Sequence, residues 1–166
     1  LLPHGPWFAY RGLDLLHLVT SPRPRSAADA PRTLLACMQF GLALGRIGDL
    51  LLSFVNRAEP VAAHMDHDVV RDLTVMTSHL ERMLADIEAA FRTRSLDKAV
   101  KVLRADTEND RLGNVITFRQ IEPAQGLRRV GSCHVLCIAQ EIERSGDLVT
   151  TMAGGVCPIC SRTNDR

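Results

Sequence analysis

Two acidic residues near the end of the chain stand at a spacing that can bind a cation. Glu143 and Asp147 lie four positions apart in the segment Glu143-Arg144-Ser145-Gly146-Asp147-Leu148. Residues four apart project from the same face of a helix, and like charges at this spacing repel. Burial beside apolar side chains makes that repulsion more costly. A cation held by carboxylate oxygens would compensate it, and so would an arginine or contact with water. The spacing alone leaves these alternatives open.

A second acidic pair and an isolated acid extend this candidate site. Asp106 and Asp110 are again four residues apart, so they share a helical face. The R-x-G-D-L pattern also occurs earlier, in Gly45-Arg46-Ile47-Gly48-Asp49-Leu50, which makes Asp49 the counterpart of Asp147. Such a duplication indicates a repeated structural unit.

Apolar residues at alternating spacings of three and four predict the helices that would position these acids. The N-cap of the second helix is expected at Asp68, and Ser95 is expected to cap the third. Gly154-Gly155 is expected to end the last helix. The four helices are predicted at about 33–56, 69–91, 96–118 and 127–152.

Each helix has a stripe that we expect to face the core. In the first, Asp49 falls in line with apolar residues, on the side predicted to be buried. In the third, Leu96, Val100 and Leu103 are expected to mark the buried face. The stripe of the first helix is Met38, Leu42, Gly45, Asp49 and Leu52. The stripe of the second is Val69, Leu73, Met76, Leu80, Met83, Ile87 and Ala90. The stripe of the last is Val135, Ile138, Ile142, Val149 and Met152.

The helix order predicts an all-α fold. Short turns join the last three helices, which is typical of an antiparallel three-helix bundle. The helix at 33–56 has the place of the last helix of a second, incomplete bundle. We therefore expect an incomplete first repeat over 1–60, a complete three-helix repeat over 61–156 and a tail over 157–166.

Composition excludes several classes of function. The formal net charge is +1 and only five Phe, one Trp and one Tyr are present, which argues against a nucleic-acid partner. Arg46 and Asp49 interrupt the longest apolar run, so no membrane span is expected. Five scattered cysteines do not suggest a disulfide framework, and a reducing cytoplasm is expected.

Taken together, the motifs resemble the PhoU family, whose usual sequence is E/D-R-I-G-D late in a helix. The second copy here reads Ile142-Glu143-Arg144-Ser145-Gly146-Asp147 after Cys137-Ile138-Ala139-Gln140, and residues 103–110 resemble the middle-helix segment ERDDEVD. The resemblance covers about 33–56 and 66–153.

This resemblance implies an all-helical, cytoplasmic, non-enzymatic regulator that restrains phosphate-starvation signalling. It implies action between the ATPase subunit of a phosphate transporter (PstB-like) and a sensor histidine kinase (PhoR-like), with a membrane met only through the transporter. It also implies a homodimer and iron or zinc bound by E/D-x-x-x-D motifs. Carried over by position, the metal ligands are Glu143, Asp147, Asp110, Asp106 and Asp49.

The chain departs from the family pattern in its first copy. Gly45 stands where an acid is usual, so a metal cluster in the first repeat is doubtful. Ser145 replaces the usual Ile. The first two helices of the first repeat are largely missing, which would expose an apolar face and favour self-association.

Cysteines and histidines offer weaker candidates. The single C-x-x-C at Cys157 and Cys160 lacks the second pair of a strong zinc signal. Cys133 and Cys137, on one helical face beside His134, could join a zinc site, but packing roles are the favoured interpretation. The cluster His64, Asp66, His67 and Asp68 could hold a metal or form a solvated linker, and His79 is expected at the edge of its helix stripe.

Two other functions remain as alternatives. A carboxylate-bridged metalloenzyme would need Glu-x-x-His pairs on facing helices, and no Glu here has a His three residues later. A plain helical interaction module, or a degenerate fragment without metal, would leave the acids as surface charge.

Overall fold

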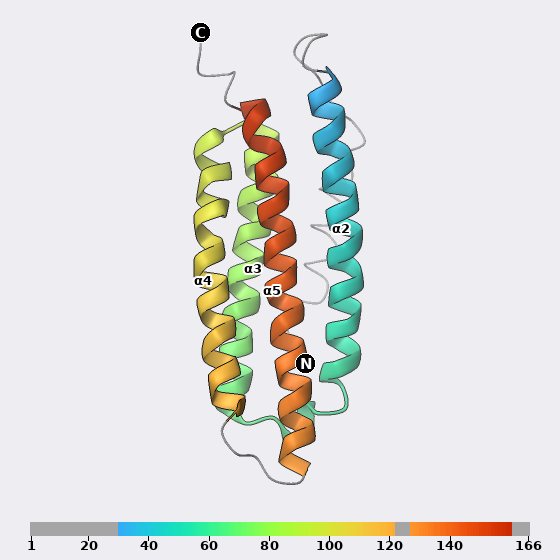
Figure 1. Ribbon diagram of the computed structural model, residues 1–166, viewed down its shortest axis with the longest axis vertical. Helices are drawn as coiled ribbons and strands as arrows, with labels where there is room; N and C mark the ends of the chain where they lie inside the picture. The colour runs from blue at the N-terminus through green and yellow to red at the C-terminus, as the bar shows by residue number, and fades with distance from the viewer. Residues whose placement is uncertain (1–29, 122–126, 161–166) are drawn as a thin grey trace.

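Four long helices make up the part of the protein that the structure describes. The computed structural model describes residues 30–121 and 127–160, and no strand occurs in these ranges, which confirms the predicted all-α class. α3, α4 and α5 form an antiparallel three-helix unit, and α2 packs along α5 (Figure 1). The elements are α2 (Ala30–Ala58), a 3-10 turn η1 (Ala62–His64), α3 (His67–Thr93), α4 (Leu96–Ile121) and α5 (Leu127–Cys160).

The predicted stripes of α3 and α5 form the core. In α3 every stripe residue from Leu73 to Ala90 is buried, and all five stripe residues of α5 are buried. Burying one such side chain contributes about 1.5–3 kcal/mol, so these two stripes supply much of the driving force for folding.

The turns at the ends of α3 differ in how well they were predicted. The N-cap of α3 is Asp66, not Asp68, which lies inside the first turn. Met65 has an extended backbone and is partly buried against the core. α3 begins soon after it, at His67, two residues before the predicted start at 69. At the other end Arg94 is left-handed (φ 51°), and Ser95 accepts a hydrogen bond from Lys98 N through Oγ, as predicted.

The buried face of α2 is not the one predicted. Phe40, Ala43 and Ile47 enter the core, and Phe40 packs against Phe91 of α3 with ring centroids 4.8 Å apart. The expected stripe faces outward, with Leu42 at 70% exposure and Asp49 exposed. Both faces of this helix are apolar, so periodicity could not decide between them; the large ring of Phe40 fills the core instead.

α4 also turns a different face inward. Leu103 is exposed, while Ala99, Val102, Asn109 and Ile116 are buried. Small residues on this face, including Gly113, let α4 pack closely on α3 and α5. Of the apolar residues chosen from the sequence, Leu96 and Val100 are only partly buried and Leu103 is exposed, so this row lies at the rim of the contact.

A polar cluster joins α2 to the three-helix unit. The buried carboxylate of Glu141 on α5 accepts hydrogen bonds from Ser53 Oγ at 2.5 Å and from Arg57 Nε at 2.8 Å, both on α2. The Arg57 guanidinium neutralises the charge of Glu141, and these contacts hold α2 at one position along α5.

The division of the chain into two repeats at residue 60 stays a prediction.

α5 continues past the predicted end of the last helix. It runs through Gly154, Gly155 and Pro158 to Cys160, four residues into the segment expected to be a tail. Val156 and Cys160 are buried in the core. Their burial outweighs the poor helix propensity of the two glycines.

α2 is long and apolar enough to cross a membrane by length and composition alone, contrary to the expectation from the sequence. A single helix of this kind is weak evidence, because a core helix of a soluble protein passes the same test. Arg46 and Asp49 lie in its middle, and Phe40 and Ile47 pack into the protein core.

Candidate metal centre

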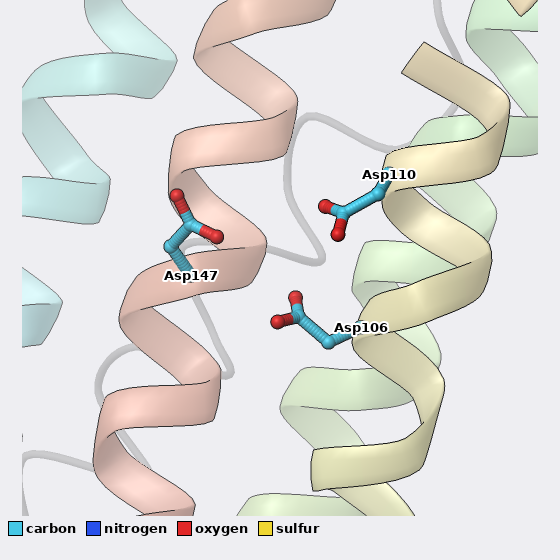
Figure 2. A group of neighbouring side chains, drawn as sticks. All are labelled: Asp106, Asp110 and Asp147. Atoms are coloured by element: carbon cyan, nitrogen blue, oxygen red, sulfur yellow. The ribbon is translucent and has the colours of Figure 1, made fainter. Parts of the chain in front are cut away.

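Three carboxylates from two helices converge between α4 and α5. Asp106 and Asp110 project from α4 toward Asp147 on α5, as Figure 2 shows. One oxygen of each lies within 4.8 Å of one from each of the others. This convergence has two causes: Asp106 and Asp110 are four residues apart on α4, and α5 packs antiparallel to α4.

Glu143 borders the same group from one helical turn away on α5. Burial raises the pKa of its carboxyl, and the charges of Asp110, Asp147 and Asp106 raise it further, while Arg144 lowers it. Its Oε2 occupies space that Gly113 leaves open, since a Cβ on Gly113 would lie only 2.8 Å from it.

The pKa of the Asp106 carboxyl is also raised by its surroundings. Burial raises its pKa first, and Asp110 and Asp147 add to this, whereas a hydrogen bond from Thr150 lowers it. Its Oδ1 is buried without a hydrogen-bond partner. The site is therefore a partly desolvated concentration of negative charge, which is unfavourable unless a proton or a cation compensates it.

Arginine does not provide that compensation in the described part of the chain. None of Asp106, Asp110, Glu143 and Asp147 forms an ion pair there. Arg144 acts on Glu143 only through its longer-range charge. Of the alternatives left open by the sequence, the arginine pairing is thus not observed.

Asn109 and Gly146 belong to this site and were missed from the sequence. Asn109 is fully buried between α4 and α5, and its Nδ2 donates a long hydrogen bond of 3.5 Å to Glu143 O. A Cβ on Gly146 would lie 3.2 Å from Asn109 Cγ and closer still to Nδ2. The signal was present: Val102, Asn109 and Ile116 recur every seven residues, which places Asn109 on the buried face.

The residues fit an oxygen-binding cation. Carboxylate and amide oxygens suit Mg²⁺, Ca²⁺ and Mn²⁺, and carboxylates also bind iron and zinc. Two buried oxygens, Asp106 Oδ1 and Asn109 Oδ1, have no hydrogen-bond partner in the structure. Asp106 belongs to the group of three converging carboxylates, and an orphaned oxygen there is what a cation would satisfy.

Asp49 is not part of this group. It lies on the exposed side of α2, whereas the three converging carboxylates lie on α4 and α5. Gly45 of the first motif has open space around it, because a Cβ added there would meet nothing within 4 Å. The two R-x-G-D-L copies therefore differ in surroundings as well as in sequence.

The two thiols of the C-x-x-C segment are partly or fully buried. Burial raises the pKa of Cys157, and burial together with Cys157 raises that of Cys160 to about 11. Nucleophilic attack needs the thiolate, so these raised pKa values disfavour a reactive thiol at either position. Cys133 is exposed, so the packing role expected for it is wrong, while Cys137 is half-buried.

The histidine candidates occupy different places. His79 on α3 lies at the α4 contact, where its Nε2 is 2.9 Å from Ala105 O. A carbonyl oxygen only accepts, so Nε2 carries the proton and donates. His64 and His67 are both exposed, as the linker interpretation expects.

Comparison with known proteins supports the family resemblance of the sequence motifs. The PhoU domain matches residues 73–156, just over half of the chain. A phosphate-specific transport system accessory protein PhoU homolog of Caulobacter vibrioides is 28% identical over 134 residues, which cover 74% of this chain and 54% of that protein. The homolog of Clostridium acetobutylicum is 23% identical over 142 residues, covering 83% and 64%.

A third homolog, from Zymomonas mobilis, is 27% identical over 128 residues and is covered to 54% of its length. The chain thus spans about half the length of two of these relatives and somewhat more of the Clostridium protein. No solved structure matches it significantly. The match of the PhoU domain to most of α3, all of α4 and nearly all of α5, the helices that carry the acidic site, shows that this chain belongs to the PhoU family.

Proposed function

We propose that this chain is a non-enzymatic accessory regulator of phosphate uptake. The observation that carries the proposal is the PhoU domain match over the helices that hold the acidic cluster. The relatives are named as accessory proteins of a phosphate-specific transport system. Because the chain spans only part of their length, the activity of a whole relative comes to it as a proposal.

In this proposal the protein binds a cation through Asp106, Asp110 and Asp147, with Glu143 at the edge. The cation, iron or zinc in the family resemblance, would neutralise the carboxylates and hold α4 against α5. Gly113 and Gly146 allow the close packing on which the site depends. In this proposal the metal stabilises the packing of α4 on α5 and takes part in no reaction.

The proposed partners are a transporter ATPase subunit and a sensor histidine kinase, met in the cytoplasm by a homodimer. The surface of α2 supports a protein-binding role. Exposed apolar patches mark interaction sites on soluble proteins, and α2 carries six such side chains: Leu34, Leu35, Met38, Leu42, Leu52 and Val55.

Genetic complementation tests the proposed regulation. In a strain that lacks its own PhoU protein and carries a phosphate-starvation reporter, expression of this chain should lower reporter activity in phosphate-rich medium. Co-purification with the transporter ATPase or the kinase tests the adaptor role. If the chain changed neither reporter output nor phosphate uptake and bound neither partner, the proposed function would be wrong.

The second candidate is a helical interaction module that binds no metal. It is favoured by the exposure of Asp110 and Asp147, which water can reach. An Asp110→Asn/Asp147→Asn variant separates the two. Under this candidate it should regulate the reporter as well as the wild type, whereas under metal-linked regulation it should not.

A further inference from the structure

One side of α2 is apolar and uncovered along most of the length of the helix. α2 packs mainly on α5 (Figure 1), and on its other side six large apolar side chains are between 55% and 70% exposed, so no other described helix covers them. These are Leu34, Leu35, Met38, Leu42, Leu52 and Val55. Because the hydrophobic effect favours the burial of such a row, the face calls for a partner.

Two residues of opposite charge interrupt this apolar face near its middle. Arg46 and Asp49 are three residues apart, and both are exposed. Spacings of four and three residues place them on the same side of the helix as Leu42 before them and Leu52 after them. In the part of the chain that the structure describes, neither forms an ion pair. The face therefore presents one cation and one anion that can pair with another molecule.

An identical face, turned end to end, has the matching charges. In a two-fold symmetric contact each residue pairs reciprocally with its counterpart. With two α2 helices antiparallel about an axis at the level of Ile47, Arg46 meets Asp49 of the partner subunit, and the same pair forms a second time. This register also sets Leu42 beside Leu52 of the partner subunit. A parallel arrangement would instead bring like charges together.

The size and shape of the face also suit a second helix. Gly45 is exposed in the same row, and a Cβ added there would meet nothing within 4 Å, so a second backbone can approach closely at the centre. Apolar side chains that are more than half exposed present about 100 Å² each. The resulting area of about 600 Å² per protomer approaches the roughly 800 Å² per partner that is usual in stable complexes.

We propose that α2 is a dimer interface, packed antiparallel on α2 of a second copy and held in register by two ion pairs between Arg46 and Asp49 of the partner subunit. This proposal rests on the homodimer of the proposed function and deepens it by naming the face. The apolar side chains supply the affinity, and the charges set the direction and register of the two helices.

Charge reversal in the full chain tests the antiparallel register. Arg46→Glu alone and Asp49→Arg alone each bring like charges together twice, so each should raise the dissociation constant of the dimer about 10- to 100-fold. An equal mixture of the two variants restores both opposite-charge pairs in the heterodimer and should dimerise about as well as the wild type. Analytical ultracentrifugation from about 1 to 100 µM measures this, since interfaces of this size have micromolar or lower dissociation constants.

A charge within the apolar row tests the face itself. Leu42→Glu should raise the dissociation constant more than about 100-fold, because the dimer would bury the carboxylate twice. The matched control is Val75→Glu, a substitution at an exposed apolar residue of α3, and it should leave the dimer unchanged. Circular dichroism checks that each variant keeps its helices.

Three results would overturn the proposal. A monomeric wild type would mean that another part of the chain or a different protein covers the face. A dimer that Leu42→Glu leaves intact would place the interface elsewhere, and a mixture of the charge variants that fails to recover would exclude the antiparallel register. A monomeric wild type that still lowered the activity of the phosphate-starvation reporter would overturn the interface alone, whereas a dimer through α2 without regulation would overturn only the proposed function.

Discussion

Asn109 of α4 and Gly146 of α5 meet so closely that no side chain fits at position 146. A Cβ there would lie 3.2 Å from Asn109 Cγ and nearer still to Nδ2. Gly146 is the glycine of the R-x-G-D motif, so this close contact explains why the motif has a glycine at that position. It is what lets Asp147 and Asp106 face each other across two helices.

Gly146→Ala should therefore destabilise the protein. Alanine favours a helix by about 0.8–1 kcal/mol over glycine, but overpacking against the buried Asn109 costs about 1–3 kcal/mol. We expect a net loss of up to about 2 kcal/mol in the free energy of unfolding, measured with urea. Gly154→Ala is the matched control, since that glycine is exposed on the same helix with open space around it.

That control should be neutral or slightly stabilising. Equal effects of the two substitutions would contradict the close contact between Asn109 and Gly146.

The raised pKa values of Asp106 and Glu143 predict a pH dependence of the metal-free protein. Their unfolded-state reference values are 3.8 and 4.5, and the folded-state values are higher. Between the two, the folded state binds more protons than the unfolded state, so stability falls as pH rises through this window. Above it, both charged carboxyls destabilise the fold.

An Asp106→Asn/Glu143→Gln variant should thus gain stability over wild type at about pH 7 in EDTA, and the gain should shrink as the pH falls through the raised folded-state pKa values toward about 4. Urea unfolding of both proteins from about pH 3.5 to 8 measures this difference. A gain that stays constant over that range would show that neither carboxyl has a raised pKa in the folded protein.

The Arg57–Glu141 pair should be worth more than an exposed ion pair. Arg57→Ala leaves the buried Glu141 carboxylate with Ser53 alone, and an under-satisfied buried group costs about 1–3 kcal/mol. Arg111→Ala removes a pair with Glu108 in which both side chains are largely exposed. That control should change the free energy of unfolding by about 0.5 kcal/mol or less. If the two variants lost similar free energies of unfolding, the contact between Arg57 and Glu141 would not be desolvated.

Thiol reactivity should follow exposure in the folded protein. Cys133 is exposed, whereas Cys160 is buried with a pKa of about 11, so very little Cys160 thiolate exists at neutral pH. Iodoacetamide labelling followed by mass spectrometry should modify Cys133 first and Cys160 last. Fast modification of Cys160 that does not depend on denaturant would contradict the burial of the C-x-x-C segment.

Periodicity located the helices, but it was less reliable about which side of each helix is buried. The stripes of α3 and α5 were predicted correctly because each has one apolar and one polar side. α2 is apolar on both sides, so its orientation depends on tertiary contacts such as that of Phe40 with Phe91. On α4 apolar residues occur both in the predicted row, which contains Leu103, and in the buried row of Val102 and Ile116, so periodicity chose the row at the rim.

The acidic site was predicted in part. The i, i+4 spacings and the antiparallel order brought Asp106, Asp110 and Asp147 together. Asn109 was missed because it stands between the charged residues Glu108 and Asp110, where a polar side chain is expected to be exposed. Its spacing of seven residues from Val102 and from Ile116 nevertheless places it on the buried face. Asp49 was added only through the motif duplication, and its place on the outward face of α2 depends on tertiary packing.

Metal analysis of the purified protein tests the central claim most directly. Wild type and Asp110→Asn/Asp147→Asn protein, purified identically and dialysed against excess Mn²⁺, Fe²⁺ or Zn²⁺, would be measured by elemental mass spectrometry. The proposed site predicts about one bound cation or more per wild-type chain and close to none in the variant. Absence of bound metal from the wild type, or equal amounts in both proteins, would contradict a metal site between α4 and α5.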